Sequence, residues 1–379
     1  MRIAIVTETW PPEINGVALT VHSLARGLRQ LGHDVELIRL ARPEDDAAEY
    51  ADGFPETLLP GASLPRYPGL RFGLPARSRL LRHWQSSRPD AIYIATEGPL
   101  GHSALTASRK LGVPACTGFH TRFDDFVAHY GFAWLTPLVF AGMRRFHNRA
   151  DATLVPTAEL ADFLRERGFR DVRLLRRAVD TSLFHPSRRD DALRREWGLD
   201  PDALTVIHVG RLAAEKNLDL AVRAFRAIQQ DTPNARFVIV GDGPERARLE
   251  SANPDIVFTG IRRGDDLARH YASADLFVFP STSETFGNVT LEAMASGLAV
   301  VAFDYGAAHE HIVSGDCGRR VRVADETEFI RATTDLANQE TRRTDMRIAA
   351  RDAVVNLYPD AVSASFSDVL DSLRMERAA

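Results

Sequence analysis

The chain has 379 residues, of which 45% are apolar and 26% charged, and its 47 basic and 51 acidic residues give a formal net charge of −4. This length suits two α/β domains, each with its own buried sheet, better than a single core. The near balance of charge argues against broad nucleic-acid binding. No stretch reaches the roughly 18 apolar residues that span a bilayer, so we expect a protein that is soluble or at most peripheral to a membrane.

The start of the chain and its cysteines bear on location. Met1 is followed at once by a strand-like segment at residues 3–7, which leaves no room for the regions of a signal peptide. The two cysteines, Cys116 and Cys317, have neither the pairing of a disulfide framework nor zinc-site spacing. Both features predict a cytoplasmic protein.

The first half of the chain alternates between strand and helix patterns. Residues 2–7 read as a buried strand, and residues 17–31 carry apolar side chains at helical spacing before Gly32, a helix stop. Further strands are predicted at 35–40, 91–95, 113–118 and 152–155, with a helix at 100–111. This alternation predicts a doubly wound parallel sheet.

The same alternation restarts in the second half. Strands are predicted at 205–210, 236–240, 256–259, 276–280 and 298–303, and helices at 217–229 and 244–250. We therefore predict an α/β protein of two Rossmann-like domains, 1–180 and 202–355, that face a central cleft. The polar residues 181–201 are expected to link them, and residues 356–379 to form a C-terminal helix that returns to the first domain.

Ligands of open parallel sheets bind beyond the carboxyl ends of the strands. Five loops in such positions hold candidate residues: 8–16, 97–101, 118–125, 210–216 and 281–292. Glu8 and Glu97, each of which follows a strand, are weak candidates for acceptor contacts.

Two cations follow the strand at 205–210. Arg211 lies directly after Gly210, and Lys216 lies five residues further on, in a chain whose only other lysine is Lys110. A lysine ammonium suits point contact with one phosphate oxygen, and an arginine fork suits paired contacts with others. The pair predicts a diphosphate site, although a solvated pair before the next helix is the alternative reading.

Two glutamates follow the strand at 276–280. Glu284 precedes the predicted helix start near Gly287 and Asn288, whose amides can bind phosphate together with the helix dipole. Glu284 is then placed to accept hydrogen bonds from sugar hydroxyls, and Glu292 from ribose hydroxyls. A simple preference of glutamate for early helical turns is the alternative for Glu292.

This constellation, with seven residues between Glu284 and Glu292, resembles the retaining GT-B glycosyltransferases of family four. The N-terminal half is similar to the subgroup that glycosylates lipids, with mannosyl, glucosyl or sulfoquinovosyl transfer. That likeness is carried by residues 12–17 (PEINGV), by His120 with Thr121, and by residues 146–156 (FHNRADATLVP).

The resemblance implies a role for each matching residue. The catalytic residues would be His120, Arg211, Lys216 and Glu284. The donor would contact Gly16, Arg211, Lys216, Glu284, Phe286, Gly287, Asn288 and Glu292. The first domain would bind the acceptor and the second the nucleotide sugar. Asn15, where many relatives carry a second glycine, puts the conformation of the first loop in doubt.

The implied reaction moves a hexose from UDP-glucose or GDP-mannose, or a similar donor, to diacylglycerol or a glycolipid, and forms an α-glycosidic bond. Positive groups at the departing diphosphate would carry the catalysis, with no protein nucleophile and no cofactor. No metal is expected, because the sequence has no Asp-x-Asp beside a sheet edge and no cluster with hard-cation spacing. The sequence does not identify the nucleobase or the hexose of the donor, and it does not indicate the oligomeric state or the processivity of the enzyme.

Other functions are weighed against this one. A nicotinamide oxidoreductase is disfavoured, because Gly241 and Gly243 are followed by Arg246 where the dinucleotide motif requires a third glycine. A non-catalytic nucleotide sensor, a nucleotide-sugar epimerase, and transfer to a soluble sugar or polysaccharide remain as alternatives.

A lipid acceptor is favoured by two segments of the first domain. Residues 57–89 contain no acidic residue but hold six arginines, with apolar residues among them: Arg66, Arg71, Arg77, Arg79, Arg82 and Arg88, and Leu70, Phe72, Leu74 and Trp84. Residues 131–143 are uncharged and precede Arg144 and Arg145. Such segments suit an anionic membrane surface, and they predict peripheral contact with the inner face of the membrane. Ordinary surface for the first and a core helix for the second are the alternatives.

Overall fold

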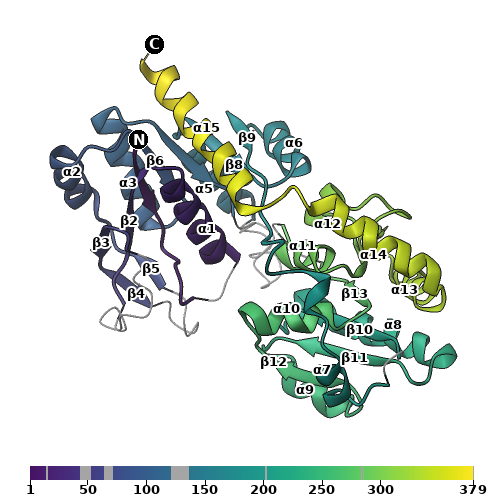
Figure 1. The fold of residues 1–379 in the computed structure, drawn as a ribbon. Helices are drawn as coiled ribbons and strands as arrows, with labels where there is room; N and C mark the ends of the chain where they lie inside the picture. The colour runs from purple at the N-terminus through teal and green to yellow at the C-terminus, as the bar shows by residue number, and fades with distance from the viewer. Residues whose placement is uncertain are drawn as a thin grey trace. The chain divides into compact units, whose positions relative to one another are not determined.

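A computed structural model describes residues 1–13, 16–42, 53–63, 71–120, 136–200, 203–282, 284 and 286–378. The chain forms two compact units, which are described separately. The first unit comprises residues 1–178 and 359–379, and the second comprises residues 179–358. The colours of Figure 1 follow the chain through both.

The first unit is built on a parallel sheet of strand order β3-β2-β1-β6-β7-β8-β9 (Figure 1). Its strands are β1 (Arg2–Val6), β2 (Asp34–Leu40), β3 (Glu56–Leu59), β6 (Ala91–Ile94), β7 (Ala115–Gly118), β8 (Ala152–Val155) and β9 (Val172–Leu174). Its helices are α1 (Gly16–Gln30), α2 (Arg77–Ser86), α3 (Pro99–Leu111), α5 (Thr136–His147), α6 (Ala158–Glu166) and α15 (Pro359–Ala378). A small antiparallel pair joins β4 (Gly61–Ser63) to β5 (Arg71–Gly73).

Both faces of this sheet are buried, because successive side chains of a strand point to opposite faces. Ile3 and Ile5 of β1 face a core that includes residues of α1 and α15. Ala4 and Val6 face a second core that includes residues of α2 and α3. The C-terminal helix α15 is thus part of the first unit, packed beside α1.

The second unit repeats the plan with strand order β12-β11-β10-β13-β14-β15, all parallel. Its strands are β10 (Thr205–Val209), β11 (Arg236–Val240), β12 (Val257–Gly260), β13 (Leu276–Phe279), β14 (Ala299–Phe303) and β15 (Arg319–Val321). Its helices are α7 (Asp191–Glu196), α8 (Leu218–Asp231), α9 (Arg246–Ala252), α10 (Gly264–Ala272), α11 (Asn288–Ala295), α12 (Gly306–His311), α13 (Glu326–Asn338) and α14 (Glu340–Val354), with short 3-10 turns η3 (Pro186–Arg188) and η4 (Ala214–Lys216).

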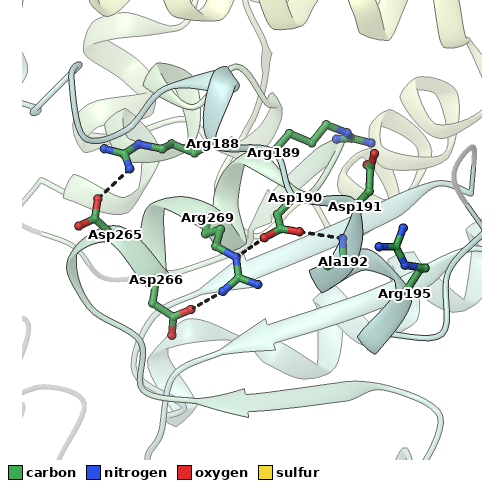
Figure 2. Close-up of a pocket in the computed structure, with 9 residues that line it drawn as sticks. All are labelled: Arg188, Arg189, Asp190, Asp191, Ala192, Arg195, Asp265, Asp266 and Arg269. Carbon is green, nitrogen blue, oxygen red and sulfur yellow. Dashed lines mark hydrogen bonds and ion pairs between the residues drawn. The ribbon is translucent and has the colours of Figure 1, made fainter.

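The residues expected to form a linker belong to the second unit. Leu193 and Trp197, in and after α7, are buried in one of its two cores. Asp190 caps α7 through the Ala192 amide at 2.7 Å and accepts a hydrogen bond from Arg269 of α10 at 2.6 Å (Figure 2). This stretch is therefore mainly polar because its polar side chains cap α7 and form ion pairs. Its few apolar side chains anchor it in the core of the second unit.

Figure 2 shows the hollow that these charged side chains surround, with a volume of about 650 Å³. Several of its charged groups pair with one another: Arg188 with Asp265 at 2.9 Å, and Arg269 with Asp190 at 2.6 Å and with Asp266 at 3.8 Å. We assign it a structural role in holding the segment before β10 against α10.

The predicted fold class is confirmed, because two parallel α/β sheets occur. The ten predicted strands appear as β1, β2, β6, β7, β8, β10, β11, β12, β13 and β14, whereas the short β3, β9 and β15 were not predicted. One prediction about the surface is wrong. Trp84, expected on a membrane-facing segment, is fully buried with Leu80 beneath α2, because these two residues lie four apart on the core-facing side of that helix. Arg66, Leu70 and residues 131–135 lie outside the described residues. Helix α5 begins at Thr136, with Pro137 in its first turn, where proline is tolerated.

Candidate functional site

The candidate donor site lies at the point where the strand order of the second sheet reverses. From β10 the chain builds outward through β11 and β12, and then returns to place β13 on the other side of β10. Loops that follow the two strands at such a point diverge and leave a crevice for ligands. Arg211 and Lys216 follow β10, and Glu284 follows β13, so both predicted groups belong to this one crevice.

Lys216 and Glu284 are in direct contact. The Lys216 Nζ donates a hydrogen bond to Glu284 Oε1, and the Ser281 hydroxyl donates to the same oxygen at 3.1 Å. The side chains of Lys216 and Glu284 are only 14% and 18% exposed. The two loops are also joined through the backbone, because the Thr282 amide donates to the Glu215 carbonyl at 2.9 Å. The ammonium and the carboxylate are therefore held together at the mouth of the crevice.

Aromatic groups of the sheet lie beneath Lys216. Its Nζ is 5.9 Å from the centre of the Phe279 ring, within the range of a cation–π contact. Phe279 is stacked on His208 of β10 at a centroid distance of 5.7 Å. Burial, and the Lys216 charge to a smaller extent, lower the pKa of His208 to about 4. His208 is therefore neutral at pH 7 and adds no second positive charge.

Glycines allow the loops after β10 and β11 to approach each other closely. A Cβ on Gly241, whose φ is +141°, would lie 1.9 Å from the Gly210 carbonyl oxygen. A Cβ on Gly243 would lie 2.3 Å from the Leu212 oxygen. Gly241 and Gly243 thus serve backbone packing and no dinucleotide motif. Arg211, which follows Gly210, is exposed. Its guanidinium has no hydrogen-bond or ion-pair partner among the residues that the structure describes.

The start of α11 is fixed in place by α12. The Ala307 amide donates to the Phe286 carbonyl at 2.7 Å, and the Phe286 ring is buried. Gly287, at φ +89°, is the left-handed residue before Asn288 opens α11. The first turn of a helix leaves amides without intrahelical partners. The segment 286–288 therefore presents a fixed helix N-terminus beside Glu284, as the phosphate hypothesis requires.

Glu292 lies one turn into α11 and is half-buried. The Tyr271 hydroxyl of α10 donates to Glu292 Oε2 at 2.9 Å. Burial raises the pKa of Glu292 to about 7, although the Tyr271 hydrogen bond opposes the rise. Glu292 is therefore partly protonated near neutral pH, a property that the sequence did not indicate. Its partner Tyr271 was not predicted, although a tyrosine in the apolar half of a helix requires a hydrogen-bond partner.

Gly16 and His120 belong to the first unit. Gly16 is the exposed first residue of α1. His120 follows β7, and both of its ring nitrogens have partners inside the unit: Tyr93 at 2.6 Å and Arg177 at 2.6 Å. Neither partner was predicted. Tyr93 is a phenol in an otherwise apolar strand, which is the one sequence signal that could have indicated it.

Glu8 and Glu97 follow β1 and β6, where the strand order of the first sheet reverses. Glu8 accepts a hydrogen bond from the Leu100 amide at 2.9 Å, and a Cβ on Gly98 would lie 2.0 Å from its carboxylate. Glu8 therefore caps α3. Glu97 accepts from the buried His147 at 3.2 Å and lines a hollow of about 610 Å³ with Arg77 and His102. Of these two glutamates, only Glu97 lines this hollow.

The described residues contain neither a metal-ligand cluster nor a membrane-spanning helix. No group of three or more histidine, cysteine, aspartate or glutamate side chains among them is placed to hold a metal ion. Within the same residues, no helix has the length and apolar character needed to cross a membrane.

Comparison with known families gives the class of this fold and site. Residues 203–339 match the family model "Glycosyl transferases group 1", and residues 14–183 match "Glycosyltransferase Family 4". The chain belongs to this family of glycosyltransferases. The names of its relatives identify it further as a hexosyltransferase.

The most informative relatives cover nearly the whole chain or most of it. The chain is 37% identical to a GDP-mannose-dependent alpha-mannosyltransferase of Mycobacterium tuberculosis, over 94% of this chain and 92% of the relative. It is 27% identical to an alpha-monoglucosyldiacylglycerol synthase of Streptococcus pneumoniae, over 80% and 71% of the two chains. Among solved structures, HepE of Anabaena in complex with UDP superposes with a TM-score of 0.79 at 20% identity, over 98% of this chain and all of that one. The last comparison supports the GT-B fold.

Proposed function

We propose that the protein transfers a hexose from a nucleotide sugar to a lipid acceptor, with retention of configuration, and so forms an α-glycosidic bond. The observation that carries the proposal is the contact of Lys216 with Glu284 where the second sheet reverses its strand order. In this proposal the Lys216 ammonium would bind the diphosphate and the neighbouring Glu284 carboxylate would bind the sugar. The name of the mycobacterial relative makes GDP-mannose the first donor to test, before UDP-glucose.

The chemistry follows from where charge develops. When the bond between the sugar and the diphosphate breaks, the departing phosphate oxygen gains negative charge, and groups fixed in advance around it lower the barrier. Lys216, Arg211 and the N-terminus of α11 are the groups that would surround that oxygen. Glu284 and the amides at 286–288 would orient the hexose, and Glu292 would bind the ribose. The proposed reaction involves no metal ion and no cofactor.

A lipid acceptor is supported by relatives that include an alpha-monoglucosyldiacylglycerol synthase and by the surface of the first unit. Helices α2 and α3 and the end of α5 pack on the same face of the sheet. None of these three helices contains an acidic residue, and their exposed cations are Arg77, Arg79, Arg82, Arg109, Lys110, Arg144 and Arg145. Three helices whose charged side chains are all positive, in a protein of net charge −4, suit the anionic surface of a membrane.

Apolar side chains next to these cations can enter the interface. Leu138 of α5 is 71% exposed and Leu74, before α2, is 40% exposed. We propose peripheral binding to the inner face of the membrane through this basic face, so that the acceptor reaches the first unit from the lipid surface.

The proposal is tested by donor and product together. A thermal-shift panel of GDP, UDP, ADP, NAD and the corresponding sugars identifies the nucleotide, because a ligand that binds the native state raises its stability. The preferred donor is then incubated with diacylglycerol, glycolipids and soluble sugars. A glycolipid product supports the proposal. A product from soluble sugars alone contradicts the lipid acceptor, and an epimerised donor without an acceptor indicates an epimerase.

A further inference from the structure

Three polar side chains form a buried chain of hydrogen bonds at the carboxyl edge of the first sheet. Arg177, after β9, contacts Nδ1 of His120 through its Nη2 at 2.6 Å. Nε2 of His120 contacts the Tyr93 hydroxyl of β6 at 2.6 Å. Tyr93 is fully buried and Arg177 is 7% exposed. The chain thus links residues from β6, from the end of β7 and from the segment after β9.

Gly118 makes room for this arrangement. A Cβ at Gly118, the last residue of β7, would lie 2.4 Å from His120 Nε2 and 2.4 Å from the Tyr93 hydroxyl oxygen. Both contacts are too short for real atoms, so the histidine ring can occupy this position only above a glycine. The ring orientation is therefore built into the strand as well as into the two hydrogen-bond partners.

The hydrogen bonds define the tautomer of His120. A guanidinium has only donors and stays protonated in proteins, so Nδ1 of His120 must accept. A neutral imidazole carries one N–H, which then lies on Nε2 and donates to the Tyr93 oxygen. Both ring nitrogens are occupied in this tautomer.

The surroundings disfavour a charge on this ring. The described titratable groups that act on His120 are Arg177 and His147 of α5, together with its partner Tyr93. Burial first, and then the Arg177 charge, lower the pKa of His120 well below its ordinary value. Arg177 faces only the Tyr93 phenol as a compensating group, and its Nε has no partner among the described atoms. A buried cation beside the ring, with no carboxylate in the described part of the chain to balance it, opposes a second positive charge.

We propose that Arg177 and Tyr93 are positioning residues that hold His120 as a neutral ring in its Nε2–H form, with a fixed orientation. His120 then serves the transfer reaction as a fixed wall of the site and exchanges no proton with the substrates. The inference rests on the proposed function only in the statement that His120 borders the sugar. The state of the ring is a property of the first unit alone.

Nitrogen NMR of the full-length protein, with ¹⁵N-labelled histidine, tests the state of the ring without donor or acceptor. The signal of His120 is identified by its loss in His120→Gln. We expect a protonated Nε2 and an unprotonated Nδ1, with no titration between about pH 8 and pH 5. An Nδ1–H ring in the wild type, or titration near the ordinary midpoint of about 6.5, would overturn the inference.

Variants separate the two partners. Arg177→Met removes the charge and the donor, so the pKa of His120 should rise relative to the wild type and Nδ1 is no longer forced to accept. Arg177→Lys keeps a cation there and should preserve the unprotonated Nδ1. Tyr93→Phe leaves Nε2–H without its acceptor while Arg177 still donates to Nδ1, so the ring should keep the Nε2–H tautomer but lose its fixed orientation, seen as broadened His120 signals. The exposed neighbour Arg176 supplies the control, and Arg176→Met should leave the His120 signals unchanged. If Arg177→Met does not fold, Arg177→Lys and Tyr93→Phe still test the positioning roles of Arg177 and Tyr93.

The pH profile of transfer gives the second readout. The wild type should show no acid limb from His120, whereas Arg177→Met, whose ring gains a proton at a higher pH, should lose kcat at a higher pH than the wild type. Identical profiles in both proteins, despite active enzyme, contradict the positioning role. A wild type that binds and transfers nothing while the NMR result stands refutes the proposed function instead.

Discussion

Lys216 and Glu284 form an ion pair, although the sequence separates them by 68 positions. A diphosphate would compete with Glu284 for the Lys216 ammonium, and a hexose would give Glu284 new partners in exchange. In the proposed function the two residues would thus exchange partners when a complete donor binds, whereas a bare nucleotide would supply only half of that exchange.

Glu284→Gln should therefore separate sugar transfer from nucleotide binding. The amide keeps the size of the side chain but releases Lys216, so the affinity for bare GDP or UDP should be equal or higher. Transfer should fall by about a hundredfold, the usual cost of losing one preorganised polar contact. Calorimetry and initial rates measure the two quantities. Glu326→Gln, at an exposed ion pair with Arg223, is the control, and an equal loss of nucleotide affinity would remove Glu284 from the sugar site.

Nucleotide affinity should rise with pH through neutrality. In the proposed function Glu292 would accept hydrogen bonds from ribose hydroxyls, which it does best as a carboxylate, and its pKa is raised to about 7. One pH unit below that value only about one tenth of the groups are ionised, so the affinity at pH 6 should be roughly tenfold below its plateau. Tyr271→Phe removes a hydrogen bond that lowers this pKa and should shift the midpoint upward. Calorimetry between pH 6 and pH 8 checks both; an unchanged profile in Glu292→Gln contradicts the assignment.

Mild acid should destabilise the folded protein through His208. Its pKa is lowered to about 4 in the folded state, whereas an unfolded histidine titrates near about 6.5. Below that pH the unfolded state binds the extra proton, so the free energy of unfolding falls as pH drops through this window, by at most about 1.4 kcal/mol per unit. Urea unfolding at several pH values measures the slope. His208→Asn should flatten it, and the same slope in both proteins would contradict the shift.

Membrane binding should depend on where positive charge is lost. Replacing Arg77, Arg79 and Arg82 of α2 by glutamine should weaken binding to anionic vesicles by about a hundredfold, at about 1 kcal/mol for each basic residue near the surface. The matched control replaces Arg223, Arg248 and Arg331, which are exposed on the second unit. Vesicle sedimentation at low and high salt compares them, since added salt screens the attraction. An equal loss of vesicle binding in both triple variants would show that binding depends on net charge alone, which would contradict a specific role for α2.

The fold could be predicted to a large extent because buried parallel strands leave near-continuous apolar runs. The runs at residues 2–7 and 205–210 became β1 and β10, and the rule for strand ends brought Lys216 and Glu284 into one candidate site. The short β15 was not predicted, because Arg319 and Arg320 interrupt its apolar pattern.

Other features depend on contacts that local sequence patterns do not show. Trp84 looked like part of a membrane surface because its segment is rich in arginine, yet only the helical phase of α2 decides that it is buried. Arg177 lies 57 positions from His120, and no local pattern marks a guanidinium as the partner of a distant imidazole. The raised pKa of Glu292 likewise follows from burial, which the sequence alone does not give.

The most direct test of the proposed function is transfer by the purified protein from GDP-mannose, or from the donor selected by the thermal-shift panel, to a lipid acceptor in anionic vesicles. We predict a glycolipid whose new linkage has the α configuration by NMR, formed at a rate that falls by about a hundredfold or more in Lys216→Ala and in Arg211→Ala. Arg223→Ala should retain the wild-type rate. A β-linked product, or near-normal rates in both site variants, would contradict the account.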